Sequence, residues 1–171
     1  FGYTSDHGDM NGMLGMYGKE TFFEPSVRIP LLMEGDGIQE GKTFRQPVSI
    51  MDIGVTLCEL AGARFEAPDG SSLAPLIHDR PFKSRPVYSQ VWEHMNIFKH
   101  PEDHRNTYGV MIVKDHYKFI TYDGCGYDML FDLEADPCER ENLAEILTEL
   151  SAELKEEALA GADPKEAAAM Q

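Results

Sequence analysis

Basic residues are scarce in this sequence: 15 Lys and Arg stand against 30 Asp and Glu, which gives a formal net charge of −15. A protein that binds nucleic acid needs a basic face to neutralise phosphates, and an anionic membrane surface attracts clustered Lys and Arg. We therefore expect neither a nucleic acid nor a membrane as a partner. One small anion held in a locally positive pocket is still compatible with this charge.

Cysteines are few, odd in number and widely spaced, at Cys58, Cys125 and Cys138. Three cysteines without a CxxC pair provide neither a disulfide framework nor a compact zinc site. We expect three free thiols that pack as small hydrophobic side chains. Unpaired thiols favour a reducing compartment, which points weakly to the cytoplasm, although the sequence does not otherwise fix the location.

Long hydrophobic runs are missing as well, and no stretch is long enough to span a bilayer. The sequence begins at Phe1, inside an expected strand, without an initiator Met or a signal region. We expect it to be part of a longer protein, with any targeting segment outside these residues.

The most informative stretch is 4–19, where a short apolar segment is followed by Asp6, His7 and a glycine-rich loop. Residues 1–5 are rich in strand-forming types and predict a buried strand. In open α/β sheets, ligands bind beyond the carboxyl ends of the strands. A carboxylate beside an imidazole suits a divalent metal of intermediate hardness. Neighbouring strand residues point to opposite faces, so both reach one metal only if the backbone turns, which Gly8 permits.

Lys19 ends the glycine-rich loop and offers a compact positive charge to an anion in that crevice. Each of these residues also has a simpler interpretation. Most lysines are solvated at the surface, and an Asp-His pair can cap a turn without binding metal. Residue types alone leave these alternatives open.

Within residues 1–85 we expect a second buried strand at 30–33 and a helix at 47–62. Ser49 is the expected N-cap, with Asp52 in the capping-box position. The apolar positions of this helix fall on one face, at Ile50, Ile53, Leu57 and Leu60.

Residues 86–171 predict a small antiparallel sheet and a final helix. The expected strands are 86–92, 108–114, 117–122 and 128–133, with a tight hairpin turn at 115–116. The helix is expected to begin near Cys138 or Glu139. Its apolar stripe consists of Leu143, Ile146, Leu147, Leu150 and Leu154. The fold class is thus α/β, with part of a larger core at 1–85 and a small subdomain at 86–171.

Several motifs in the same order resemble the C-terminal part of formylglycine-dependent (type I) sulfatases, within the alkaline phosphatase-like superfamily. The matching segments are Ser5-Asp-His-Gly8, Tyr17-Gly-Lys19, Phe23-Glu-Pro-Ser-Val-Arg-Ile-Pro-Leu31 and Leu130-Phe-Asp-Leu-Glu-Ala-Asp-Pro-Cys-Glu-Arg-Glu-Asn-Leu-Ala144. The resemblance implies an incomplete alkaline phosphatase-like core, in which the helix at 47–62 packs on the central sheet, followed by a small antiparallel sheet with a C-terminal helix.

The same resemblance implies roles for three residues. Asp6 and His7 would be metal ligands, with calcium expected first and magnesium or manganese as alternatives, and Lys19 would bind the sulfate and act in catalysis. Further carboxylates and the formylglycine nucleophile, made in a Cys/Ser-x-Pro-x-Arg motif, would come from upstream. This sequence contains no such motif. We therefore expect the chain alone to be inactive, and its partners to be the missing N-terminal part and a small sulfated substrate.

Two further functions remain open. Phosphonate monoester and phosphodiester hydrolases of the same superfamily share the metal-centred crevice, and a non-catalytic module could retain the fold. The family often has an acidic residue and His where Met13 and Leu14 stand, which indicates an altered substrate pocket.

Other polar residues receive weaker assignments. Asp9 is a candidate to orient His7, and Arg28 is expected to form a structural ion pair. Spacing argues against a zinc site formed by His94, His100 and His104, and Trp92 and Phe98 are expected to pack. Self-association through an exposed sheet edge is a further expectation.

Overall fold

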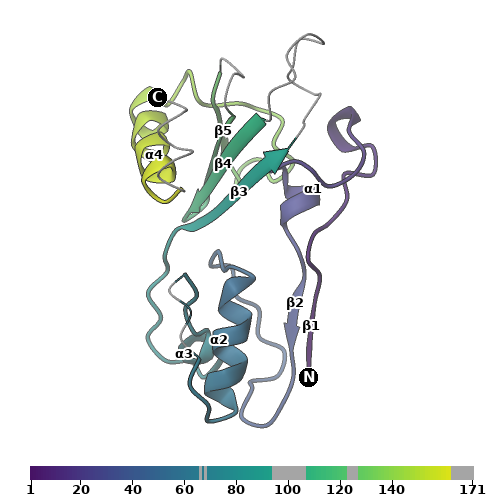
Figure 1. Ribbon diagram of the computed structural model, residues 1–171, viewed down its shortest axis with the longest axis vertical. Helices are drawn as coiled ribbons and strands as arrows, with labels where there is room; N and C mark the ends of the chain where they lie inside the picture. The colour runs from purple at the N-terminus through teal and green to yellow at the C-terminus, as the bar shows by residue number, and fades with distance from the viewer. Residues whose placement is uncertain (66, 68, 94–106, 123–126, 163–171) are drawn as a thin grey trace. The chain divides into compact units, whose positions relative to one another are not determined.

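The computed structural model describes residues 1–65, 67, 69–93, 107–122 and 127–162, and Figure 1 shows its elements along the chain. The chain divides into two compact units. Unit 1 comprises Phe1–Asp6 and Ile29–Arg85, and unit 2 comprises His7–Arg28 and Pro86–Gln171. Most of the glycine-rich loop thus belongs with the C-terminal residues.

Unit 1 contains a two-stranded antiparallel ribbon of β1 (Gly2–Thr4) and β2 (Leu31–Met33), in which Tyr3 pairs with Leu32. Both strands occur where the sequence predicts them. Their predicted burial is wrong, because β1 is exposed along its length and Leu32 keeps 62% of its surface exposed. A ribbon of two strands gives each side chain only one neighbouring strand and buries little surface.

The helix predicted at 47–62 is α2 (Met51–Leu60). Its start shows one half of the expected capping box, the bond from Ser49 to the Asp52 carboxylate, but the N-cap residue is Ile50 and the prediction of Ser49 at that position is wrong. The amide of Ser49 donates to Asp52 Oδ2 at 2.9 Å, and the amide of Met51 donates to Ser49 Oγ at 3.3 Å. These contacts satisfy amides that the first helical turn leaves without a partner.

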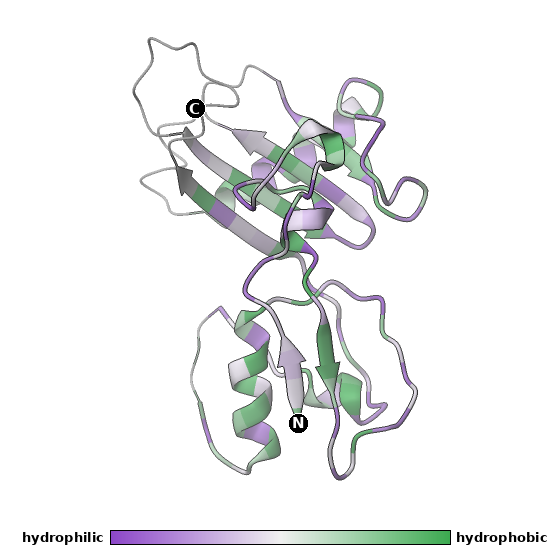
Figure 2. Ribbon diagram, turned by 90° about the vertical axis from the view of Figure 1, so that its right-hand side faces the viewer, coloured by the Kyte–Doolittle hydropathy of each residue, from purple (hydrophilic) through white to green (hydrophobic). Residues whose placement is uncertain are grey.

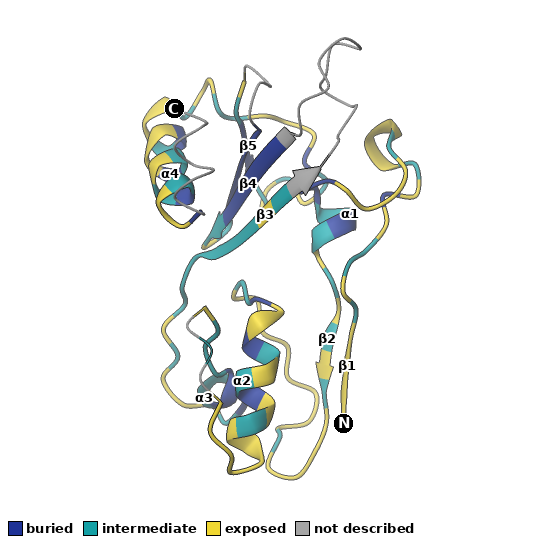
Figure 3. Cartoon of the chain, in the orientation of Figure 1, coloured by how far each residue is buried: buried dark blue, intermediate teal, exposed yellow. Residues whose placement is uncertain are grey.

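The apolar stripe of α2 is largely exposed in unit 1, and the packing on a central sheet that the resemblance implies stays a prediction (Figures 2 and 3). Ile50 and Leu57 are 49% and 48% exposed. The buried side chains of α2 are instead Asp52 and Thr56. Both accept backbone amides from the segment that leads into the short helix α3 (Ala74–Ile77). The polar edge of α2 turns inward because these amides need acceptors.

Unit 2 contains the predicted antiparallel sheet, in the order β3-β4-β5-β6. Its strands are β3 (Val87–Glu93), β4 (Thr107–Lys114), β5 (Tyr117–Tyr122) and β6 (Met129–Asp132). The tight turn between β4 and β5 is confirmed, with Asp115 in the left-handed region at φ 55°.

Both faces of this sheet are covered, so each strand buries alternate residues on opposite sides. Helix α4 (Thr148–Ala160) covers one face and residues 7–28 cover the other (Figure 1). The core under α4 consists of Tyr108, Val110, Ile112, Phe119, Leu130, Leu154, Ala158 and Ala162. The core under residues 7–28 consists of Met10, Phe22, Phe23, Met111, Ile120, Tyr122, Met129 and Phe131.

Helix α4 begins well after the predicted start near Cys138 or Glu139, which is therefore wrong. The preceding segment is a turn in which the Asp136 carboxylate accepts the amides of Arg140 and Glu141 at 2.6 and 2.9 Å. Glu139 lies in the left-handed region at φ 53°, which interrupts a regular helix. Of the predicted stripe, Leu143, Leu147, Leu150 and Leu154 contact the core under α4, whereas Ile146 is 66% exposed.

The segment before α4 also runs along the edge of β6. The amide of Leu143 donates to the carbonyl of Leu130 at 2.8 Å. The side chain of Asn142 accepts the amide of Leu130 at 2.9 Å and donates to the carbonyl of Asp128 at 3.0 Å. Both backbone groups of Leu130 that face away from β5 are thereby paired.

Candidate functional site

The glycine-rich loop brings the side chains of His7 and Lys19 together. Lys19 Nζ lies 2.9 Å from His7 Nε2, and His7 Nδ1 lies 2.7 Å from the carbonyl oxygen of Gly8. Because a carbonyl oxygen only accepts hydrogen bonds, the ring proton belongs on Nδ1 and Nε2 presents its lone pair to the lysine. This is the tautomer whose Nε2 serves as a metal ligand.

Gly8 is required for a close backbone approach. Its amide donates to the carbonyl of Ser26 at 2.7 Å, in the short helix α1 (Glu24–Val27). A Cβ atom at position 8 would lie 2.0 Å from the carbonyl oxygen of Pro25. Glycine is thus needed here for the close approach to α1, whereas the backbone turn toward a shared metal that the sequence predicts at Gly8 stays a prediction.

The loop between His7 and Lys19 is closed by its own amides. Met10 donates to the carbonyl of Gly18 at 2.7 Å, and Gly12 donates to that of Met16 at 2.8 Å. Met10 is fully buried and anchors the loop in the core. Gly12 and Gly18 have φ of 88° and 85°, values that glycine adopts without strain.

The tip of this loop carries exposed apolar side chains. Met13 and Leu14 are 43% and 45% exposed, and Tyr17 is 83% exposed. Leu14 has φ 53°, an uncommon conformation for a residue with a side chain. The two residues that depart from the family pattern, Met13 and Leu14, are therefore exposed at the tip of the loop.

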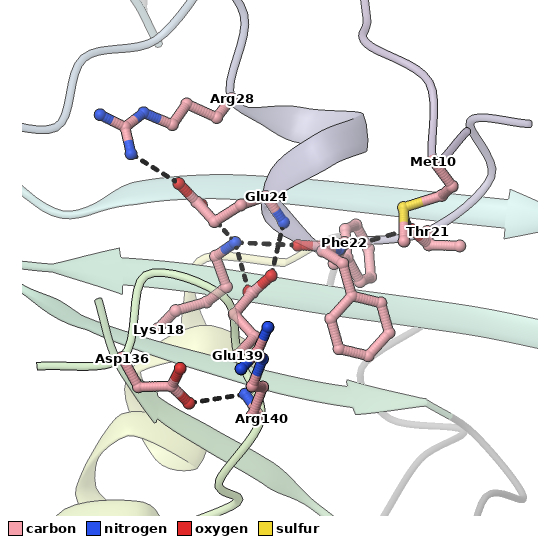
Figure 4. Close-up of polar contacts among 10 residues, drawn as sticks. Met10, Thr21, Phe22, Glu24, Arg28, Lys118, Asp136, Glu139 and Arg140 are labelled. Atoms are coloured by element: carbon pink, nitrogen blue, oxygen red, sulfur yellow. Dashed lines mark hydrogen bonds and ion pairs between the residues drawn. The ribbon is translucent and has the colours of Figure 1, made fainter. Parts of the chain in front are cut away.

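A buried ion cluster, consisting of Lys118, Glu24 and Glu139, attaches α1 to the sheet (Figure 4). Lys118 of β5 is fully buried and donates to Glu24 Oε1 at 2.5 Å, to Glu139 Oε1 at 2.8 Å and to the carbonyl of Phe22 at 3.0 Å. Glu139 Oε2 in turn accepts the amide of Glu24 at 2.6 Å. Helix α1 is thus held through side chain and backbone together.

The sequence does not predict the ion cluster, although the position of Lys118 within a mainly apolar strand is a signal of it. Strand β5 alternates between two buried faces, so position 118 faces the same core as Ile120. A lysine at such a position needs buried acidic partners. Burial raises the pKa of Glu139, and the ammonium of Lys118 opposes this shift.

Arg28 forms the expected structural ion pair, with its Nη1 3.6 Å from Glu24 Oε2. Asp9 Oδ1 accepts the amide of Asn11 at 2.8 Å, and its expected role in orienting His7 stays a prediction.

Asp6 ends the first segment of unit 1, whereas His7 and Lys19 belong to unit 2. Within unit 1, Ser5 Oγ lies 3.4 Å from Asp6 Oδ1. A shared metal site of Asp6 and His7 therefore stays a prediction. A carboxylate and the Nε2 tautomer of His7 fit a divalent cation chemically. In the described part of the chain, no group of three or more His, Cys, Asp and Glu side chains is arranged to hold a metal ion.

Two of the three cysteines, Cys58 and Cys138, are free thiols, as expected.

Several other predictions fall on residues that the structure does not describe. Outside the described residues, or without a described side chain, lie Trp92, His94, Phe98, His100, His104 and Cys125. None of the helices among the described residues has the length and apolar character that a membrane span requires.

Comparison with known proteins decides the family. Residues 12–162 match the family described as N-sulphoglucosamine sulphohydrolase, C-terminal. The chain belongs to this sulfatase family. The choline-sulfatase of Rhizobium meliloti (strain 1021) is 36% identical over 147 residues, which cover 84% of this chain and 26% of that protein. Human arylsulfatase K is 32% identical over 152 residues, which cover 87% of this chain and 28% of that protein.

Solved structures agree with this assignment. A 2-O GAG sulfatase superposes with a TM-score of 0.72 at 30% identity, covering 90% of this chain and 34% of that one. The phosphonate monoester hydrolase of Agrobacterium radiobacter superposes with a TM-score of 0.71 at 25% identity, covering 93% and 34%. The sulfatase domain described here thus spans about a quarter to a third of the length of these relatives.

Proposed function

We propose that the intact protein hydrolyses sulfate esters, with Lys19 binding the sulfate and Asp6 and His7 holding a divalent metal. The observation that carries the proposal is the 2.9 Å contact between Lys19 Nζ and His7 Nε2. It places a cation next to a ring nitrogen whose tautomer suits metal binding. Sulfatase relatives that align with most of the chain support the same reaction class.

Each residue has a distinct task in this proposal. The ammonium of Lys19 stabilises the negative charge that develops on the sulfate oxygens in the transition state. The hydrogen bond from Nδ1 of His7 to Gly8 holds the ring so that Nε2 is the ligand atom. A divalent metal, with calcium preferred, would supply Lewis-acid polarisation when bound. The nucleophile that the resemblance implies is a formylglycine made in a Cys/Ser-x-Pro-x-Arg motif, and this sequence does not contain that motif.

The alternative is a phosphonate monoester or phosphodiester hydrolase. The likeness to the phosphonate monoester hydrolase of Agrobacterium radiobacter favours it specifically. Sulfate and phosphonate esters both present anionic oxygens to Lys19, so this chain's residues serve either reaction.

The test uses the intact protein with an aryl sulfate and an aryl phosphonate monoester as parallel substrates. We expect a higher kcat/KM on the sulfate, loss of turnover with a chelator and recovery with calcium. A higher kcat/KM on the phosphonate would select the alternative. No turnover of either substrate, together with a full-length sequence lacking the formylglycine motif, would leave a non-catalytic module. The 171-residue chain alone is expected to be inactive.

A further inference from the structure

Ser26 connects the backbone segments that carry His7 and Lys19. Its hydroxyl donates to the carbonyl oxygen of Lys19. Its own carbonyl accepts the amide of Gly8 at 2.7 Å, and the carbonyl of Gly8 is the partner of His7 Nδ1. One buried residue therefore contacts both sides of the pair, and Ser26 is only 2% exposed.

The helix that carries Ser26 is itself fixed from the sheet. Lys118 binds Glu24 at the start of α1, and Glu139 accepts the Glu24 amide. A continuous set of hydrogen bonds thus runs from β5 through α1 to the His7 and Lys19 backbones. Stacking of Phe22 on Tyr122, with ring centroids 5.3 Å apart, holds the residues just before α1 in the same core.

We propose that Ser26 is a positioning residue that sets the separation of the His7 imidazole and the Lys19 ammonium. The ion cluster of Lys118, Glu24 and Glu139 keeps α1 in the place that Ser26 needs. The catalytic consequence of this inference rests on the proposed function. In that function the Lys19 ammonium binds the sulfate and therefore has to be kept at a fixed distance from the His7 imidazole. A displacement of about 1 Å at a reacting centre costs up to about a hundredfold in rate.

The test compares Ser26→Ala with Ser151→Ala in the intact protein. Ser151 is a buried serine of α4, on the opposite face of the same sheet, so it controls for loss of a buried hydroxyl. We expect Ser26→Ala to lower kcat about ten- to a hundredfold, with little change in KM. We expect Ser151→Ala to leave kcat unchanged. Thermal midpoints should fall by only a few degrees in either variant.

A second readout does not depend on turnover. The ring ¹⁵N chemical shifts of His7, assigned by comparison with His7→Gln, report how its two nitrogens are bonded. They should change in Ser26→Ala and stay constant in Ser151→Ala. Equal kcat values in the two serine variants with unchanged His7 shifts would overturn the positioning role. If Lys19→Met leaves turnover intact, the proposed function fails, while the His7 shifts still decide the role of Ser26.

Discussion

The ammonium of Lys19 lies against Nε2 of His7, at 2.9 Å, where it takes the lone pair that a metal ion would use. One lone pair cannot serve a cationic donor and a metal ion at the same time. In the proposed enzyme, Nε2 of His7 would hold the metal, and the ammonium of Lys19 would then be available to the sulfate.

This competition gives a prediction for Lys19→Met. The variant should bind calcium more tightly than the wild-type protein, because a competing cation is removed. Its kcat/KM should fall about 10²- to 10³-fold, since a donor to the developing charge is lost. Calorimetric calcium titration after chelation measures the first effect and steady-state kinetics the second. Lys42→Met, at a partly exposed lysine paired with Asp79, is the control. Weaker calcium binding by Lys19→Met would contradict the competition.

Lys118→Met should destabilise the fold strongly. It leaves Glu139 buried without its cation and leaves Glu24 with only the exposed Arg28, and the loss of a buried partner costs about 3–5 kcal/mol. Chemical denaturation of the intact protein measures the change in the free energy of unfolding. Lys155→Met should cost no more than about 1 kcal/mol, because its pair with Asp128 is partly exposed.

A double variant separates charge from packing. Glu139→Gln added to Lys118→Met removes one uncompensated carboxylate and should recover part of the lost stability. If Lys118→Met costs no more than Lys155→Met, the ion cluster does not hold α1 as described.

Gly8→Ala should destabilise the loop because its Cβ would meet the carbonyl oxygen of Pro25 at 2.0 Å. Forced insertion of one carbon into a packed site costs about 1–3 kcal/mol. Gly2→Ala is the matched control, since no atom lies within 4 Å of a Cβ there. Denaturation midpoints of the two variants provide the comparison. Equal midpoints would contradict the close approach of Gly8 to α1.

Protonation of the Asp136 carboxylate in acid should abolish its contribution to the free energy of unfolding. The amide of Glu141, followed by that of Arg140, holds the pKa of Asp136 below its usual value of 3.8. A carboxyl group with a lowered folded-state pKa stabilises the fold above its unfolded pKa. That contribution is lost as the pH falls through the folded value.

Asp136→Asn should therefore be less stable than wild type near neutral pH, and the difference should shrink below about pH 3.8. Urea denaturation across pH 2–7 measures it. Asp115→Asn, at the exposed turn between β4 and β5, controls for the loss of one negative charge. A difference that grows with acid would refute the assignment.

Local patterns predicted the small sheet well, because alternation and turn residues act over short distances. The strands on either side of Asp115 are an example, and the bond between Ser49 and Asp52 at the start of α2 is a second short-range feature that the sequence predicts. The late start of α4 depends on side-chain acceptors such as Asp136, which bind the amides of a turn. The periodicity of apolar residues does not show whether such an acceptor favours a helix or a turn. The exposure of Leu57 could not be predicted from the sequence either. An apolar stripe identifies one face of a helix but does not show which residues cover that face.

For the site, motif order identified His7 and Lys19, which the structure brings together. The support beneath them was not visible in the sequence. Lys118 and Glu139 are distant from the loop along the chain, and only the fold brings them to Glu24. Ion pairs between residues that are far apart in the sequence can be identified only after the pairing of the strands is known.

Asn142 occupies the place beside Leu130 where the backbone of an additional strand would lie. A carboxamide copies one donor and one acceptor of a peptide group, so it terminates hydrogen bonding on that side of β6. An incoming chain would have to displace this side chain before it could extend the ladder. Together with the amide of Leu143, which donates to the Leu130 carbonyl, this carboxamide closes the part of the β6 edge at which another chain could add, as natural sheets need at their borders.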